Sequence, residues 1–122
     1  MLQSKSKGVI FITAEEFAKK IGEWIEAKNG FEIDILNVSE KTSIANYFVI
    51  ASGSSERQVK AIADNIEFET KEMEIFPKGI EGMRESRWIL MDYYDVIVHI
   101  FHQNERETYD LDRLWKDELV AR

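Results

Sequence analysis

The sequence predicts an α/β fold, a single domain in which a mixed sheet of roughly five strands is flanked by helices. The length of 122 residues suits one domain and is too short for two. The continuous apolar run 47–51 precedes a Gly/Ser turn and a helical pattern, as expected of a strand that is buried on both faces. The segment 88–101 contains two strand-like runs with a tight connection, which indicates a β-hairpin. We expect residues 1–12 to form an N-terminal segment and residues 13–122 to form the domain.

The first half of the domain is expected to contain one helix and two strands. Thr13 can cap the helix, and Glu16 can complete a capping box with it. Apolar residues then recur at helical spacing until Asn29–Gly30, a typical helix end. A strand is expected over residues 31–38, and the buried run 47–51 forms the next strand.

The second half is expected to add a helix, a short strand, the hairpin and a final helix. Ser55 with Gln58 repeats the capping-box pattern, and the apolar stripe of the following helix extends to Met73. A short edge strand is expected near residues 80–82. After the hairpin, residues 104–122 show a helical stripe. The predicted order is therefore α-β-β-α-β-β-β-α.

The composition argues against several classes of function. The formal net charge is −7, whereas binding to many phosphates needs clustered Lys and Arg, so we expect no direct sequence-specific nucleic-acid binding. An acidic chain is better suited to a basic protein partner, although acidity also serves solubility. The absence of cysteine excludes disulfides and thiolate metal sites and fits a reducing cytoplasm. No apolar run approaches the roughly 20 residues that cross a bilayer, so no membrane partner is expected.

The first candidate site is the turn Ser52-Gly53-Ser54-Ser55, with Arg57 just inside the helix. Free backbone N–H groups and the positive end of a helix dipole would together bind an anion there. A nucleotidyltransferase would also need paired carboxylates for a metal, as in an Asp-x-Asp motif, and the residue two positions after Asp34 is Leu36. We therefore favour a tight turn with helix caps, while a nucleotide-binding protein or nucleotidyltransferase stays open as the alternative.

The second candidate site is the hairpin, for which we assume that Tyr93–Tyr94 forms a two-residue loop. That loop sets the pairs across the two strands: Asp92 with Asp95, Leu90 with Ile97, and Trp88 with His99. Like charges directly opposite destabilise a sheet, and Tyr-Tyr is a poor primed turn. Positions that break local rules in this way are where function is expected.

Three interpretations of the polar-aromatic hairpin face stay open. The two aspartates and a histidine could serve acid–base or metal chemistry. However, the pKa of a carboxylate at an exposed tip is the least easily shifted. An aromatic anchor with a charged rim is typical of a protein interface. The face could also be a second core surface beneath the last helix. We favour the protein interface over catalysis.

The motifs resemble those of the ribosomal silencing factors, also called the Iojap family. The matching stretches are residues 45–59, 81–82 and 88–101, Arg106, and residues 109–115. Together they span nearly the whole chain after Thr13. Each motif alone is weak, but four motifs in the right order and spacing form a specific pattern. Two positions depart from it: Asn46 stands where the family usually has Asp, and Tyr94 stands where Gly is usual.

The resemblance implies a nucleotidyltransferase-like fold without nucleotidyltransferase activity. It implies binding to ribosomal protein uL14 (L14) of the large subunit, which would block subunit joining and repress translation when nutrients are scarce. A role in large-subunit biogenesis is also implied, and no enzyme activity, cofactor or metal is required. The contact residues carried over are the anchors Trp88 and Leu90, the charged partners Asp92 and Asp95, the flanking His99, and Glu81 and Tyr109. A homodimer that buries the hairpin face between two copies is a further alternative.

Overall fold

The computed structural model describes residues 2–4, 10–109, 113 and 118–120, which form two sheets and three helices. The elements in chain order are β1 Leu2–Ser4, β2 Ile10–Ile12, α1 Ala14–Glu26, β3 Phe31–Asn37, β4 Tyr47–Gly53, α2 Glu56–Glu72, β5 Gly79–Glu81, β6 Trp88–Asp92, β7 Val96–His102 and α3 Gln103–Tyr109. β1 and β2 pair as a small antiparallel sheet that the sequence did not predict. No helix in the described part of the chain is long and apolar enough to cross a membrane.

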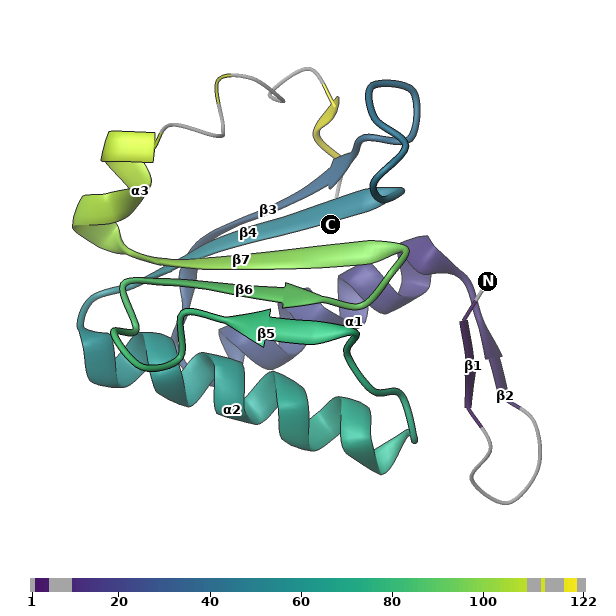
Figure 1. Cartoon of the computed structure of the whole chain (residues 1–122), viewed down its shortest axis with the longest axis horizontal. Helices are drawn as coiled ribbons and strands as arrows, with labels where there is room; N and C mark the ends of the chain where they lie inside the picture. Colours follow the sequence, from purple (N-terminus) through teal and green to yellow (C-terminus); the bar gives the residue numbers. More distant parts are fainter. Residues whose placement is uncertain (1, 5–9, 110–112, 114–117, 121–122) are drawn as a thin grey trace.

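The main sheet has the strand order β3-β4-β7-β6-β5. β4 and β7 are parallel, and the other neighbouring strands are antiparallel. α1 and α2 both cover one face of this sheet (Figure 1). The predicted mixed five-stranded sheet with flanking helices is confirmed, while its likeness to nucleotidyltransferases stays a prediction. We call the sheet face turned away from α1 and α2 the open face.

The first helix forms as its sequence predicts. The Glu16 N–H donates to Thr13 Oγ1 at 3.0 Å, and the Thr13 N–H donates to Glu16 Oε1 at 2.9 Å, so the capping box is complete. Asn29 has a positive φ of 64°, which ends the helical turn before β3. On the apolar side of α1, Phe17, Ala18, Ile21 and Ile25 are fully buried in the core, and Trp24 is partly buried.

The second helix has the predicted cap but only half of the predicted capping box. Ser55 accepts from the Gln58 N–H at 3.1 Å. The Gln58 side chain does not return to Ser55. Its Oε1 accepts from the Ser54 N–H and hydroxyl, and its Nε2 donates to the Asn29 carbonyl at 2.9 Å. Gln58 therefore links the start of α2 to the end of α1. The spacing of residues within α2 cannot reveal this contact, because Asn29 is distant in the sequence.

The hairpin register predicted from the sequence is wrong by two residues. The observed pairs are Trp88 with Phe101, Leu90 with His99, and Asp92 with Ile97. The Tyr93 N–H donates to the Val96 carbonyl at 2.8 Å, so the two-residue turn is Tyr94–Asp95, and Asp92 does not face Asp95. A shift of two positions keeps every side chain on its predicted face, because strand side chains alternate with period two.

The burial of Tyr93 explains the observed register. Its side chain is fully buried, and its ring meets Phe17 edge-on at 5.4 Å between centroids. Its hydroxyl shares a hydrogen bond of 2.9 Å with the hydroxyl of Thr70 on α2, and burial raises the pKa of Tyr93 to about 12. A loop position for Tyr93 would give up this packing, so the turn moves one residue along to Tyr94–Asp95.

The predicted last helix does not extend to the C-terminal residues that the structure describes. The described part of α3 is Gln103–Tyr109, and Leu119 forms an isolated antiparallel bridge with Leu36 on β3. The Val120 N–H donates to the Ile35 carbonyl at 2.7 Å, so residues 119–120 lie along a strand rather than continue a helix. Residues 110–112, 114–117 and 121–122 of the prediction lie outside the described residues.

Candidate functional site

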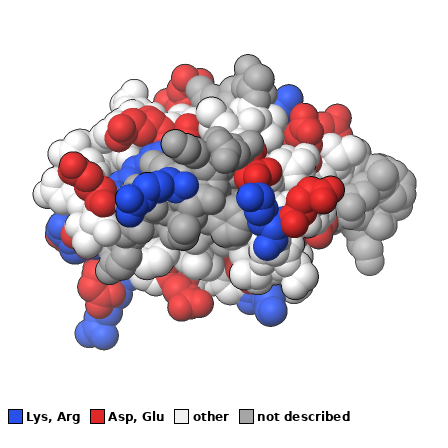
Figure 2. All heavy atoms as spheres, turned by 90° about the horizontal axis from the view of Figure 1, so that it is seen from above, with Lys and Arg blue, Asp and Glu red and all other residues white. Residues whose placement is uncertain are grey.

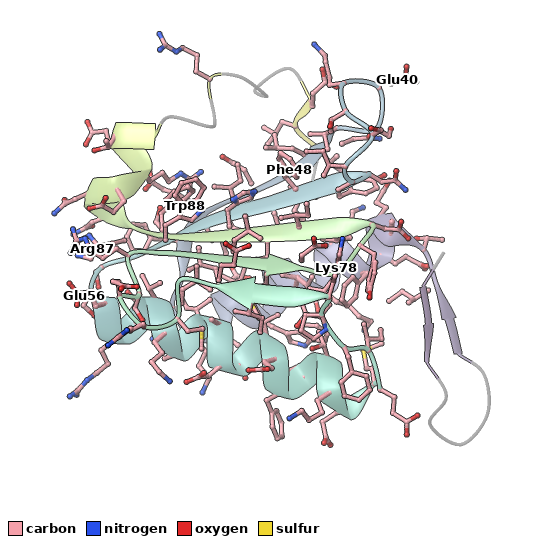
Figure 3. The ribbon with its side chains drawn as sticks, viewed as in Figure 1. Glu40, Phe48, Glu56, Lys78, Arg87 and Trp88 are labelled. Carbon is pink, nitrogen blue, oxygen red and sulfur yellow. The ribbon has the colours of Figure 1, made fainter. Side chains whose placement is uncertain are left out.

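The open face brings the predicted contact residues of three strands together. Cross-strand pairing places Glu81, Leu90 and His99 in one row across β5, β6 and β7. Trp88 and Asp92 lie on either side of Leu90 on the same face of β6, because side chains alternate along a strand. Figure 3 shows the Trp88 side chain on the side of the sheet away from α2.

Two predicted contact residues stand apart from this row. Asp95 lies in the β6–β7 turn, where its carbonyl accepts from the N–H groups of Asn46 and Tyr47. Tyr109 is the last residue of α3, and its side chain lies outside the described part of the structure. Asp95 and Tyr109 therefore stay predicted contact residues outside the row.

Aromatic rings fill the open face around His99. The Trp88 ring stacks on Phe101 at 5.0 Å between centroids and lies 6.0 Å from the His99 ring. Phe48 meets His99 edge-on at 5.2 Å. The Trp88 Nε1–H donates to His99 Nδ1 at 3.2 Å. Trp88 is partly buried as a result, and its indole is held in one orientation.

His99 is buried rather than exposed as a flank of the site. Only 6% of its surface is accessible. This burial lowers the pKa of His99 to about 4, so the imidazole is neutral near pH 7. Because Nδ1 accepts a hydrogen bond from Trp88, the ring proton lies on Nε2. His99 therefore positions Trp88 and carries no charge at neutral pH.

The carboxylates of the site lie at its margin. Asp92 is partly buried, and its Oδ1 accepts from the Tyr94 N–H at 2.8 Å. Glu81 is exposed on the edge strand β5. Within residues 2–4, 10–109, 113 and 118–120, no three His, Asp or Glu side chains are arranged to hold a metal ion. The arrangement offers negative charge around an apolar centre.

Gly82 has a role that the sequence motif Glu81–Gly82 did not explain. Its φ is 89°, a region that glycine adopts freely. A Cβ at this position would lie 2.1 Å from the Trp88 carbonyl oxygen. Glycine is therefore required for the chain to pass this close to the start of β6, next to the Trp88 anchor.

The Gly/Ser turn of the first candidate site lies at the N-terminus of α2. A Cβ on Gly53 would lie 2.9 Å from a Val59 side-chain carbon, so glycine permits close packing there. Ser55 caps the helix, the N–H and hydroxyl of Ser54 already bond to Gln58, and Arg57 is exposed. These contacts account for the turn residues through capping and packing, and the anion site stays a prediction.

Arg106 is a residue of the open face whose role the sequence did not reveal. It is 7% exposed, and its guanidinium donates to Ser52 Oγ at 3.1 Å, to Asp34 Oδ2 at 2.9 Å and to the Glu32 carbonyl. It therefore ties α3 to β3 and β4. An arginine in a helical pattern is normally read as exposed. The only sequence signal was its place in the motif that resembles the family.

Comparison with known proteins identifies the family. The family described as "Ribosomal silencing factor during starvation" matches residues 12–121. A ribosomal silencing factor of Bacillus subtilis is 42% identical over 77% of this chain and 80% of its own length. A crystal structure of a protein from Chromobacterium violaceum superposes with a TM-score of 0.83 at 34% identity, covering 86% of this chain and 88% of that one.

A more distant relative is named for ribosome assembly. A mouse protein named "Mitochondrial assembly of ribosomal large subunit protein 1" is 28% identical over 75% of this chain, which spans 41% of that protein. The names of the bacterial relatives describe silencing of the ribosome, a regulatory rather than a catalytic role. With one family matching almost the whole chain and a relative more than 30% identical over most of its length, the protein belongs to the ribosomal silencing factor family.

Proposed function

We propose that this protein is a translational repressor that binds ribosomal protein uL14 on the large subunit and sterically blocks joining of the small subunit. It acts in the cytoplasm, and it contributes to large-subunit biogenesis as well. Membership of the silencing family supports the first part, and the name of the mouse relative supports a tie to the large subunit. The mechanism needs only occupation of a surface, with no chemical step.

The observation that carries the proposal is the composition of the open face. Trp88 and Leu90 pack against the border of an apolar cluster, and each keeps part of its surface exposed. Aromatic anchors in such surroundings dominate the binding energy of protein interfaces. Because His99 and Phe101 hold the indole in place, less conformational freedom is lost on binding.

The charge of the site suits a basic ribosomal protein. Asp92 and Glu81 flank the apolar anchors on the same face, and Asp95 lies in the adjoining turn. Opposite charge favours encounter with a basic protein, while the net charge of −7 disfavours contact with rRNA phosphates. This combination favours the protein component of the subunit over its RNA.

Co-sedimentation with purified large subunits tests the proposed contact. Wild-type protein is expected in the large-subunit pellet at low salt, and Trp88→Ala is expected to weaken binding by at least about tenfold. Trp24→Ala is the matched control, because Trp24 is also partly buried but belongs to α1 on the covered face. Circular dichroism confirms that both variants fold. Failure of the wild-type protein to co-sediment, or equal loss with Trp24→Ala, contradicts the proposal.

Subunit joining distinguishes silencing from binding alone. Large subunits incubated with the wild-type protein before small subunits are added should give less light scattering from joined ribosomes than untreated subunits. Trp88→Ala should restore joining at the same concentration. Full joining in the presence of bound wild-type protein would mean that the protein does not block the subunit interface.

A further inference from the structure

Two strongly exposed apolar side chains, Ile44 and Tyr94, lie at the same end of the main sheet. Ile44 is 69% exposed and Tyr94 is 58% exposed. Ile44 belongs to the β3–β4 loop and Tyr94 to the β6–β7 turn, which lie at one end of the sheet in Figure 1. The N–H groups of Asn46 and Tyr47 donate to the Asp95 carbonyl at 2.9 and 3.0 Å and hold loop and turn together. We call Ile44 and Tyr94 the hairpin-end patch.

The backbone of Tyr94 is in a conformation that favours glycine. Its φ is 71°, a value that bulky residues rarely adopt. The Asp92 carboxylate accepts the Tyr94 N–H at 2.8 Å and helps to hold the turn. Glycine would fit this position without strain, yet the chain carries an aromatic ring that projects into solvent. An outlier of this kind indicates a functional use of the side chain.

The rim of the hairpin-end patch is predominantly acidic. The charged residues at this end include Glu40, Lys41, Lys78, Asp92, Asp95 and Glu118. Four of these six are acidic, and Lys41 is ion-paired with Glu118 at 3.4 Å. Glu15, which bonds the Tyr47 hydroxyl, is paired with Lys19 at 3.2 Å, so that pair adds no net charge. Figure 2 views the molecule from above and shows acidic groups with basic groups among them toward both ends. An apolar centre with this rim complements a basic partner and disfavours a second acidic copy of this chain.

We propose that the hairpin-end patch is a second docking point for the same basic ribosomal protein that contacts Trp88. An aliphatic side chain of the partner packs on Ile44 and Tyr94, beside a Lys or Arg that faces the acidic rim. The patch adjoins the Trp88 region, because Asp92 both shares the face of Leu90 and accepts the Tyr94 N–H. This inference rests on the proposed function and adds Tyr94 and Ile44 as contact residues.

Substitution by glycine separates the two roles of Tyr94. Tyr94→Gly removes the ring and relieves the backbone, so the thermal midpoint should stay the same or rise. Its dissociation constant for purified large subunits should nevertheless increase by about tenfold, as expected for loss of an aromatic interface residue. Ile44→Ser should weaken binding in the same direction, and Tyr94→Trp should retain most of the affinity.

Controls keep this inference distinct from the proposed function. Phe68→Ser is the matched control, because Phe68 is 60% exposed but belongs to α2, away from the open face, and its loss should leave the affinity unchanged. Tyr94→Gly binding as tightly as wild type, while Trp88→Ala loses binding, overturns the hairpin-end patch alone. Absence of wild-type binding overturns both proposals. A dimer that Tyr94→Gly converts to monomer with unchanged affinity for large subunits also overturns the patch.

Discussion

Trp88 and His99 contact each other but differ in exposure: part of Trp88 is accessible to a partner protein, whereas His99 is buried. The indole is partly buried, whereas the imidazole lies among Phe48, Trp88 and Phe101. Protonation of His99 would replace the Nδ1 acceptor with a second donor and place a charge between aromatic rings. The geometry of the anchor therefore depends on a neutral histidine.

Acid is expected to destabilise the fold through His99. Burial lowers its pKa from 6.5 in the unfolded chain to about 4 in the folded protein. The unfolded chain therefore takes up the proton first, and stability that is present above pH 6.5 is lost as the pH falls toward 4. The contribution of His99 to this loss is about 3 kcal/mol over the whole range.

Urea unfolding of wild type and His99→Phe across this range measures the contribution. The free energy of unfolding of the wild type should fall relative to that of the variant by about 1.4 kcal/mol per pH unit. Carboxylates titrate in both proteins, so the difference isolates the histidine. A difference that stays constant with pH would show that His99 is not the group responsible.

At the scale of elements, α3 is held to the sheet by two arginines in unlike surroundings. Arg106 is buried over β3 and β4, whereas the side chain of Arg87 is 40% exposed and bonds Glu105 and Glu56 at 2.7 and 2.9 Å. Figure 3 shows Arg87 beside Glu56. Buried ionic contacts are costly to break from one side, but exposed ones contribute little.

The two arginines should therefore differ in their effect on stability. Arg106→Met leaves Ser52 Oγ and the Glu32 carbonyl without this donor and should lower the free energy of unfolding by about 3 kcal/mol. Arg87→Met should lower it by less than about 1 kcal/mol. Chemical unfolding of both variants measures the difference. Equal losses would mean that burial does not decide the strength of these contacts.

Elements with local signals could be predicted from the sequence. Thr13 and Glu16 are three residues apart, and both halves of their capping box form. The apolar run 47–51 lies within β4, which is buried throughout. Such features depend on neighbours in the chain, and so spacing alone reveals them.

Elements that depend on distant contacts could not be predicted. Two tyrosines follow Asp92, and only the Phe17 and Thr70 surroundings, far away in sequence, decide that Tyr93 is buried. The candidate site shows the same division. Alternation placed the hairpin residues on the correct face, but the pairing of Leu90 with His99 and the burial of His99 required the sheet.

At the scale of the whole molecule, the helices and the proposed partner contact lie on opposite faces of the main sheet. α1 and α2 cover one face of the sheet, and the proposed contact lies on the other (Figure 1). The net charge of −7 adds a long-range attraction to a basic partner. This attraction extends only about 10 Å at an ionic strength near 0.1 M.

Association with the large subunit should therefore be sensitive to salt. Raising the ionic strength from about 0.05 to about 0.3 M is expected to slow association by roughly tenfold, while dissociation changes less, because screening acts mainly on the encounter. Stopped-flow mixing of labelled protein with large subunits measures both rates. Association that is independent of salt would exclude charge steering.

The contact between Leu119 and Leu36 affects the tendency of this protein to aggregate at high concentration. An unpaired sheet edge can recruit the strand of another copy and lead to aggregation. The bridge at Leu36 and the hydrogen bond from Val120 to Ile35 occupy part of the β3 edge. The opposite edge, β5, is three residues long and follows Lys78. Both margins of the main sheet therefore discourage polymerisation, which leaves the faces of the molecule for recognition.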